Sequence, residues 1–361
     1  MPVVLILFFI SGCIHKDNDQ EWGGEITEEM GTVVVSNPKT PLYQGRLLSL
    51  REDLTIGETV GSEEYIFSNI RQAVVSGTGD IYVLDSKESH IKIFDKEGIY
   101  IRTIGKRGQG PGELDNARLI SINNDRLVVT ESGRRLSFFD LDGNFQKNIP
   151  TGEMWVLWAM TDSRGRLMLL TATLSESASY NVGLYDQDLN LLHEIGSSPA
   201  PVAIAIDPFA PVAYQIVDYS DQIIYGYPDR YQIDIFGPEG KKVGTLRREY
   251  DPVLVTEEEI KEETEGLPPQ IKVNPSKIHS AFCRFFPDDE GRLYVQTWKK
   301  DVTDFFYDIF DRQGRYLLQT KLPERPFMCR GGKLYCVVED EEGYQQVKRY
   351  EMLWTEQDRT F

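Results

Sequence analysis

The chain has 361 residues, of which 57 are Asp or Glu and 39 are Lys or Arg, so its formal net charge is −18. Nucleic acids and anionic lipid surfaces attract clustered Lys and Arg, so this balance argues against both as electrostatic partners. The simplest role of the charge is solubility. The length alone would allow two domains, but a repeat fold can reach this length as one.

An apolar run over residues 3–10 stands near the start of the sequence. It is too short to span a bilayer, which needs about 20 residues, and it has the length of a signal-peptide core. The tetrapeptide Ile10–Cys13, with small residues before the cysteine, resembles a bacterial lipobox. We therefore expect a lipoprotein signal peptide over residues 1–12 and a lipid anchor at Cys13. A buried apolar N-terminus is the alternative, because no basic residue precedes the run.

A polar stretch follows the cysteine, and it is rich in Asp, Glu and Gly between Asp17 and Met30. Such a composition cannot bury enough apolar surface to fold alone. We expect residues 13–30 to be a flexible acidic tether between a membrane and a folded domain over residues 31–355.

The main body of the chain is repetitive. Residues 79–114 predict a strand, a turn, a second strand, a turn, a third strand and a glycine-rich loop, and weaker copies follow. Apolar triplets that open a second strand recur six times, at intervals of 40 to 70 residues, beginning at Ile81, Leu127, Leu167, Ile223, Leu293 and Leu334. Repeats of this length are typical of four-stranded propeller blades. The sequence therefore predicts an all-β fold, a six-bladed β-propeller of four-stranded antiparallel blades.

The last repeat, over residues 327–353, shows three strands and no convincing fourth. Residues 46–57 predict a strand that ends in Ile-Gly, as the outer strands of two other repeats do. We expect this N-terminal strand to complete the last blade, because such a closure joins the two ends of the ring and covers an exposed sheet edge.

The longest interval between repeats contains an insertion at about residues 250–279. Thr256 and Glu259 have the spacing of a capping box, which predicts a short acidic helix that stops before Gly266. The insertion is either a solvated decoration or a lid or partner-docking element.

The exit loop of the first repeat, Gly105–Leu114 (GKRGQGPGEL), resembles that of NHL-type six-bladed propellers. With the lipobox and the Asp-x-x-Gly turns, residues 31–355 resemble the prokaryotic six-bladed propeller lipoproteins more closely. This resemblance implies a propeller fold and a location in the cell envelope, facing away from the cytoplasm. It implies little about activity, since propellers host unrelated functions.

Catalytic motifs are missing from the sequence. There is no phosphate-binding loop, no calcium-loop spacing and no nucleophile motif, and the four histidines, His15, His90, His193 and His279, are far apart. A propeller can still gather metal ligands from different blades around its axis. A calcium- or zinc-dependent hydrolase or lyase of the lactonase or amidating-lyase kind, with its site in the central channel, is therefore the alternative function. We otherwise expect no cofactor.

Three cysteines remain beyond Cys13. Cys329 and Cys336 flank a predicted hairpin turn and could form a disulfide in one register only; buried free thiols are the other interpretation, as for Cys283.

Loops between blades, and between the second and third strands of each blade, meet on one face of a propeller. We expect the following residues near that face: Arg107, Arg134, Arg135, Trp298 and Lys299. Arginine and aromatic side chains suit a binding surface, although packing or simple exposure explains any single one as well. The sequence therefore favours a non-catalytic binding or scaffolding module for a protein, peptide or glycan partner, attached to a membrane by its lipid.

Overall fold

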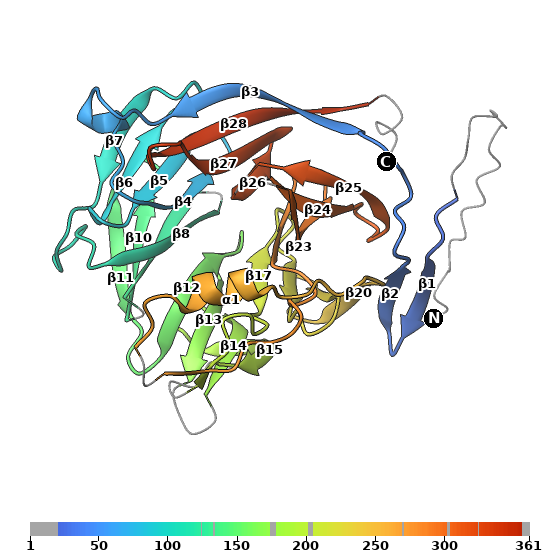
Figure 1. The fold of residues 1–361 in the computed structure, drawn as a ribbon. Coiled ribbons are helices and arrows are strands. Elements are labelled where there is room, and N and C mark those ends of the chain that lie inside the picture. Colours follow the sequence, from blue (N-terminus) through green and yellow to red (C-terminus); the bar gives the residue numbers. More distant parts are fainter. Residues whose placement is uncertain are drawn as a thin grey trace, which may run out of the picture.

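The computed structural model describes residues 21–355 except 124, 133, 174–177, 201–204, 269–270, 302–303 and 324. Cys13, the expected signal peptide and the first part of the expected tether lie outside the described residues. Six blades of four antiparallel strands stand around a central axis, and the sheet of one blade is extended by two further strands (Figure 1). The predicted six-bladed β-propeller is confirmed.

The first three blades each run in chain order from an innermost to an outermost strand. Blade 1 comprises β4 (Ile70–Val75), β5 (Ile81–Asp85), β6 (His90–Phe94) and β7 (Tyr100–Ile104). Blade 2 comprises β8 (Ala117–Asn123), β9 (Arg126–Glu131), β10 (Arg135–Asp140) and β11 (Phe145–Pro150). Blade 3 comprises β12 (Trp155–Thr161), β13 (Leu167–Thr173), β14 (Ser179–Tyr185) and β15 (Leu191–Pro199).

The second half of the ring repeats this order, with two additions from the N-terminal part of the chain. Blade 4 comprises β17 (Tyr214–Val217), β18 (Ile223–Gly226), β19 (Gln232–Phe236) and β20 (Lys242–Arg248). Blade 5 comprises β22 (Arg284–Pro287), β23 (Leu293–Asp301), β24 (Asp304–Phe310) and β25 (Tyr316–Leu322). Blade 6 comprises β26 (Pro326–Arg330), β27 (Lys333–Glu339), β28 (Gln345–Trp354) and the N-terminal β3 (Leu48–Ile56).

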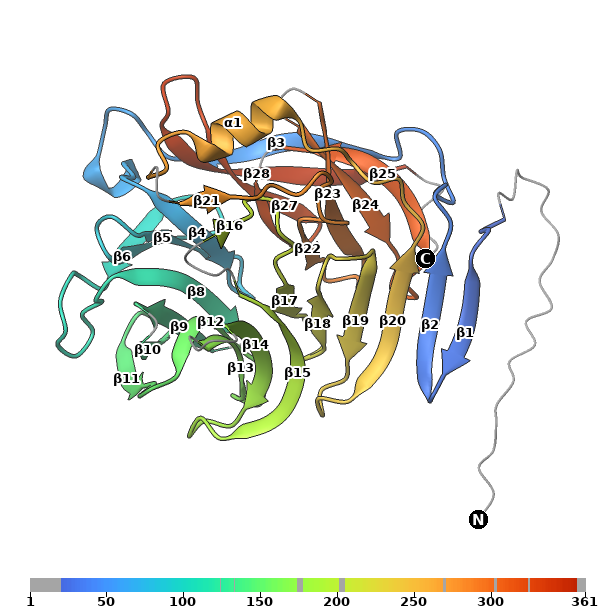
Figure 2. The same cartoon turned by 60° about the horizontal axis from the view of Figure 1, so that its bottom comes forward.

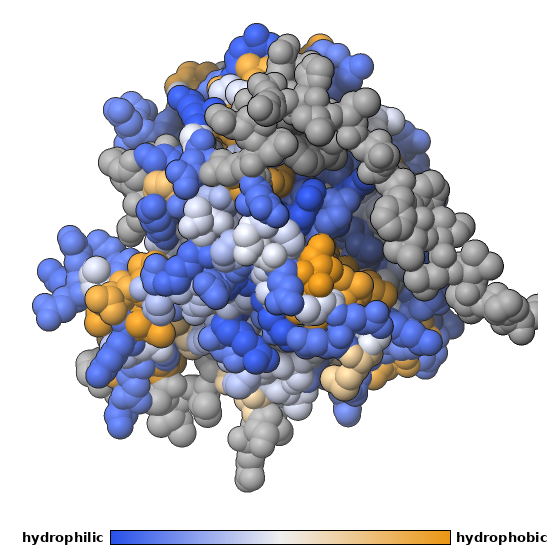
Figure 3. Space-filling model, turned by 90° about the vertical axis from the view of Figure 1, so that its right-hand side faces the viewer, coloured by the Kyte–Doolittle hydropathy of each residue, from blue (hydrophilic) through white to orange (hydrophobic). Residues whose placement is uncertain are grey.

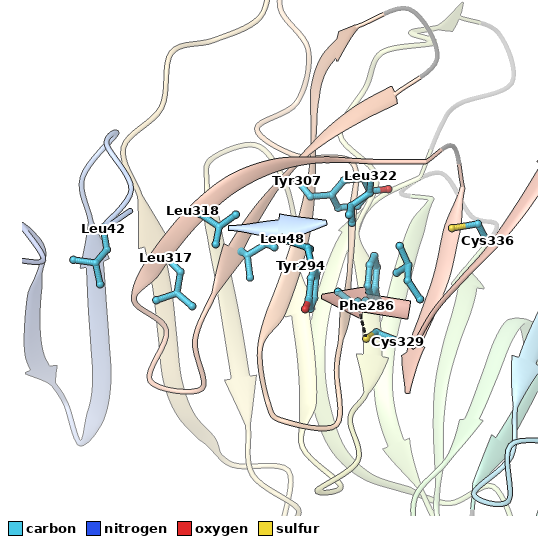
Figure 4. Packing of buried hydrophobic residues seen from close by; sticks show 13 residues of the cluster. Leu42, Leu48, Phe286, Tyr294, Tyr307, Leu317, Leu318, Leu322, Cys329 and Cys336 are labelled. Carbon is cyan, nitrogen blue, oxygen red and sulfur yellow. Dashed lines mark hydrogen bonds between the residues drawn. The ribbon is translucent and has the colours of Figure 1, made fainter. Parts of the chain in front are cut away.

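The ring closes as the sequence predicts. β3 pairs antiparallel with β28 along its whole length, from Leu48 opposite Trp354 to Ile56 opposite Val347. Ile56 is buried in a cluster that blade 6 shares with blade 1. Leu48 lies in the cluster between blades 5 and 6 (Figure 4). A strand from before blade 1 is thus packed on both sides of the junction between the chain ends.

The N-terminal hairpin differs from the expected tether. β1 (Glu25–Glu29) pairs with β2 (Thr32–Asn37), and β2 adds in parallel to the outer edge of β20. All five side chains of β1 are exposed. Its sequence therefore lacks the apolar alternation of a buried strand and resembles a tether, although its backbone is paired. Residues 25–29, which were expected in the tether, are therefore a paired strand. Hydrophilic residues dominate this side of the molecule, with hydrophobic ones gathered in small patches (Figure 3).

Asn37 fixes the end of this hairpin to blade 5. Its amide nitrogen donates to the carbonyl of Gly314 over 2.9 Å, and its amide oxygen accepts from the backbone N–H of Tyr316 over 2.7 Å. The indole N–H of Trp22 donates to the same oxygen over 3.1 Å. The hairpin is thus part of the folded domain.

The insertion contains the predicted helix. In α1 (Glu257–Thr264) the Thr256 hydroxyl accepts from the backbone N–H of Glu259, whose carboxylate accepts from the N–H of Thr256, so the capping box is formed. A parallel pair, β16 (Ala205–Ile206) and β21 (Lys272–Val273), joins the insertion to the connection between blades 3 and 4. Both views place these elements on one face of the ring (Figures 1 and 2). A single turn of 3-10 helix, η1 (Glu63–Tyr65), precedes blade 1.

The cysteines of blade 6 are free thiols. In the hairpin register Cys329 lies opposite Leu334 and Cys336 opposite Pro326, so the two do not face each other. Both lie in the buried cluster between blades 5 and 6, where Phe286 and Tyr294 stack at 5.0 Å between ring centroids (Figure 4). Burial raises the pKa of the third described thiol, Cys283, to about 12.

Replacing Ile56 tests the closure. Ile56 is 1% exposed, so Ile56→Ala leaves a cavity and should lower the free energy of unfolding by about 2–5 kcal/mol in urea titrations. The matched control Ile99→Ala removes the same atoms from a side chain that is 60% exposed and should change it by less than about 1 kcal/mol. Equal effects of the two would contradict a closure that depends on β3.

Candidate functional site

The innermost strands of the six blades surround the axis of the ring. Each of them pairs with one strand only, so its other backbone edge faces the channel. The channel holds a cavity of about 450 Å³ whose wall includes residues of all six innermost strands, β4, β8, β12, β17, β22 and β26. Small-molecule sites commonly occupy cavities of this size, with an apolar wall and a few polar groups.

Aromatic rings of three consecutive blades form one side of the wall. The rings of Trp158 and Tyr214 meet edge to face at 5.7 Å, and those of Tyr214 and Phe285 at 5.1 Å. The indole N–H of Trp158 is buried there and finds no acceptor among the described residues. Met160 and Ile216 extend this apolar side.

Arginines of blades 5, 6 and 1 line the cavity near the face where the innermost strands begin. Arg284 opens β22, Arg325 directly precedes β26 and Arg71 is the second residue of β4. Gln296 accepts from Nε of Arg284 over 2.7 Å and so fixes this guanidinium. Arg325 lies 3.9 Å from a carboxylate oxygen of Glu339. Within the described chain, neither Arg71 nor Arg284 has a carboxylate at ion-pair distance.

Tyr219 lies across the opposite end of the cavity. Its hydroxyl donates to the carbonyl of Cys329 over 2.9 Å and so connects blade 4 to blade 6. The Arg330 guanidinium lies 5.0 Å from the centre of the Tyr219 ring and donates to the carbonyl of Val75 over 3.1 Å. Burial raises the pKa of Tyr219, so the phenol keeps its proton and remains a donor at neutral pH.

Two aspartates line the same end, and both hold hydrogen bonds within the protein. Asp218 accepts from the backbone N–H groups of Ser220 and Gln222, yet burial keeps its pKa raised. Asp221 accepts from the backbone N–H and the hydroxyl of Ser163. Among the residues whose positions are described, no group of three or more His, Cys, Asp or Glu is arranged to hold a metal ion.

Two predicted residues, Arg107 and Arg134, lie exposed on the loop-bearing face. The Arg107 guanidinium donates to the carbonyl of Lys87 over 2.6 Å. The Arg134 guanidinium lies 5.2 Å from the centre of the Trp155 ring and donates to the carbonyl of Gly152 over 3.2 Å. Both side chains are exposed on this face.

Arg135 has a different environment. It pairs with the buried carboxylate of Glu131 and donates to the carbonyls of Gln109 and Glu113, over 3.1 and 3.2 Å. These contacts fasten the glycine-rich loop to blade 2. Glu113 itself accepts from the backbone N–H of Gly110 over 2.9 Å, so the carboxylate of the loop occupies the place where an anion could bind.

Trp298 and Lys299 lie in blade 5, away from the three arginines of blades 1 and 2. The indole of Trp298 stacks on His279 at 4.2 Å and donates to the Ser280 hydroxyl over 3.0 Å, so it holds the insertion against the blade. The Lys299 ammonium lies 4.3 Å from the centre of the Phe306 ring. The five predicted residues therefore share a face of the ring but do not form one site.

Sequence reasoning missed the cavity because its residues are dispersed over six strands. Each one sits in a short apolar segment that reads as core. A signal was present, however: arginines stand at the start of several innermost strands, as in Arg71-Gln72, Arg284-Phe285 and Arg325-Pro326. Their recurrence at the same point of the repeat indicates a shared position near the axis.

The repeat architecture and the central site are those of a β-propeller. The chain belongs to the 6-bladed beta-propeller family, whose sequence profile matches residues 58–324. No helix of the described residues is both long and apolar enough to cross a membrane.

Similar proteins are distant. A Bacteroides fragilis protein proposed to be exported has a TM-score of 0.57 and 12% identity, over 88% of this chain and 99% of that one. Virginiamycin B lyase from Staphylococcus aureus has a TM-score of 0.46 and 10% identity, over 84% of this chain and 99% of that one. "Protein brain tumor" of Drosophila melanogaster is 24% identical over 179 residues, which are 48% of this chain and 16% of that protein. At these identities the two solved structures indicate a fold alone.

Replacing Arg135 tests its role in holding the loop. Arg135→Gln leaves the buried Glu131 carboxylate without its partner, so the free energy of unfolding should fall by about 3 kcal/mol in urea titrations. Arg134→Gln, one residue away and exposed, should cost less than about 1 kcal/mol. If both variants were equally stable, Arg135 would be a rim residue like its neighbour.

Proposed function

We propose that the protein is a non-catalytic binding module of the cell envelope, whose ligand enters the central cavity from the loop-bearing face. The observation that carries this proposal is the cavity of about 450 Å³, whose lining combines aromatic rings of three blades with four arginines. Apolar area with a few oriented donors is what a recognition site needs. Tyr219 bridges blades 4 and 6 at one end of the cavity, which favours entry from the loop-bearing face.

The composition of the wall supports binding over metal-dependent hydrolysis or elimination. A catalytic calcium or zinc needs several carboxylates or imidazoles that converge with an open coordination position. The described lining offers Asp218 and Asp221 as its carboxylates, and both are used by neighbouring N–H and O–H groups. It contains no histidine or glutamate.

Exposed cationic side chains on the loop-bearing face support the binding of a partner larger than the cavity. Arg107, Arg134 and Lys299 are exposed on the same face, and α1 lies over that face. A protein, peptide or glycan could therefore place one group in the cavity and contact the rim with the rest. We retain these three classes as the expected partners.

The lipobox supports the location. A lipid at Cys13 would hold the propeller at the membrane, facing away from the cytoplasm. Trp22 is bonded to Asn37, so eight residues, 14–21, separate Cys13 from the first side chain held on the domain. They reach at most about 30 Å when fully extended.

Equilibrium dialysis tests the binding function. Purified protein, dialysed against a peptide and glycan extract of bacterial envelopes, should retain a compound that mass spectrometry recovers chemically unchanged. Met328→Trp fills the cavity from β26 and should abolish retention, whereas Arg107→Glu with Arg134→Glu should weaken it only for partners that reach the rim. Thermal melting confirms that each variant is folded. Recovery of a converted compound would replace the binding function with catalysis, and retention unchanged by Met328→Trp would exclude the cavity.

Replacing the cysteine tests the anchor. Cys13→Ser removes the thiol that would carry the lipid, so the chain should lose incorporated palmitate and leave the membrane fraction in its bacterial host. Cys283→Ser, at a half-buried thiol of the propeller, should leave both unchanged. Membrane association that survives Cys13→Ser would contradict a lipid anchor at this position.

A further inference from the structure

We propose that the cavity binds a small organic anion, in which a carboxylate, sulfate, sulfonate or phosphate group is attached to an apolar or ring-shaped body. This inference rests on the proposed function, because it names the class of ligand for the same cavity. Three features of the cavity support it: the net charge of the lining, the position of the arginines and the aromatic part of the wall.

The lining of the cavity has a net charge opposite in sign to that of the whole protein. The whole chain carries a net charge of −18, yet the lining contains four arginines, two aspartates and no other ionisable group of Lys, Glu or His type. Both aspartates are engaged in hydrogen bonds close to the Tyr219 end. The other end therefore has an excess of positive charge inside an acidic protein, which favours anions there over cations.

Arg284 differs from six other half-buried arginines of the ring. Each of those six pairs with a carboxylate: Arg135 with Glu131, Arg166 with Asp162, Arg248 with Asp308, Arg292 with Asp288, Arg315 with Asp311 and Arg349 with Asp53. Arg284 is also half-buried, but its Nε donates to the neutral side chain of Gln296, over 2.7 Å, and not to a carboxylate. Leaving a partly desolvated guanidinium without a counter-charge is costly, and a bound anion would remove that cost.

The arrangement of these groups suits a bidentate acceptor. Arg284, Arg325 and Arg71 belong to blades 5, 6 and 1, which are consecutive around the ring, and all three lie where the innermost strands begin. The hydrogen bond to Gln296 uses Nε of Arg284, and its terminal nitrogens, which also lie near the Tyr307 hydroxyl, have no carboxylate partner among the described residues. Guanidinium groups bind carboxylate, sulfate and phosphate oxygens through paired N–H donors.

The aromatic part of the cavity wall determines the chemistry of the rest of the ligand. Trp158, Tyr214 and Phe285 belong to blades 3, 4 and 5, with ring centroids 5.1 to 5.7 Å apart. An acid without an apolar body would leave this surface in contact with water. The combination therefore selects an amphipathic anion over inorganic phosphate or sulfate.

A matched pair of dyes tests the class. 1-Anilinonaphthalene-8-sulfonate carries a sulfonate on an aromatic body, and N-phenyl-1-naphthylamine is its neutral counterpart. Fluorescence titration of folded wild-type protein should show the sulfonate bound at least tenfold more tightly than the amine, since charge-assisted hydrogen bonds to arginine are lost with the neutral dye. Raising the salt concentration should weaken the sulfonate alone.

Substitutions place the effect in the cavity. Arg284→Gln should weaken the sulfonate about tenfold and leave the amine within twofold, whereas Arg107→Gln, on the rim, should change neither. If Arg284→Gln melts at a much lower temperature, Arg71→Gln replaces it, because that side chain is exposed and has no carboxylate at ion-pair distance among the described residues. Trp158→Phe should reduce energy transfer from the protein to the bound sulfonate.

The outcomes separate the two proposals. Equal affinity for both dyes, together with loss of both in Met328→Trp, would overturn the anion class and leave the cavity as a binding site. Sulfonate binding that persists in Met328→Trp would overturn the inference, because the dye would then lie elsewhere. The proposed function would in that case stand or fall on the dialysis experiment.

Discussion

The pairing of β3 with β28 holds the rest of the structure in place. Blade 6 receives its outer strand from a segment that precedes blade 1, so the two ends of the repeat array are joined by a full strand of backbone hydrogen bonds. Ile56 and Leu48 bury the same strand in the clusters on either side of the joint. Only a closed ring brings all six innermost strands to one axis, and the cavity exists because they meet there.

Three turns of the ring share one hydrogen-bonding arrangement, which can be recognised in the sequence. In the segments 162–166, 288–292 and 311–315, an aspartate is followed by glycine and then arginine, four residues on. One carboxylate oxygen accepts from two backbone N–H groups of the turn, and the other accepts from Nε of the arginine, over 2.6 to 2.7 Å. The carboxylates and guanidinium groups of these turns neutralise each other locally. Arg284, whose partner in the cavity wall is the neutral Gln296, differs from this pattern.

Local sequence was therefore sufficient for the blades, the capping box of α1 and the closure by β3, since each depends on alternation, turn residues or a repeated ending. It was insufficient for β1, whose five exposed side chains look like a tether although the backbone is paired. It was also insufficient for the cavity. Arg71 and Arg284 are more than two hundred residues apart in the sequence. They line the same cavity only because the ring brings their strands to one axis. Arg135 and Trp298 stand on the expected face, but their contacts are internal.

The position of the N-terminal hairpin has a consequence for how the molecule would sit on a membrane. β2 joins the ring at the periphery of blade 4, and Trp22 is bonded to Asn37 at that flank. If Cys13 carries a lipid, as we propose, the chain would run from it to this flank of blade 4 and not to an opening of the ring. Both openings would then lie away from the point of attachment.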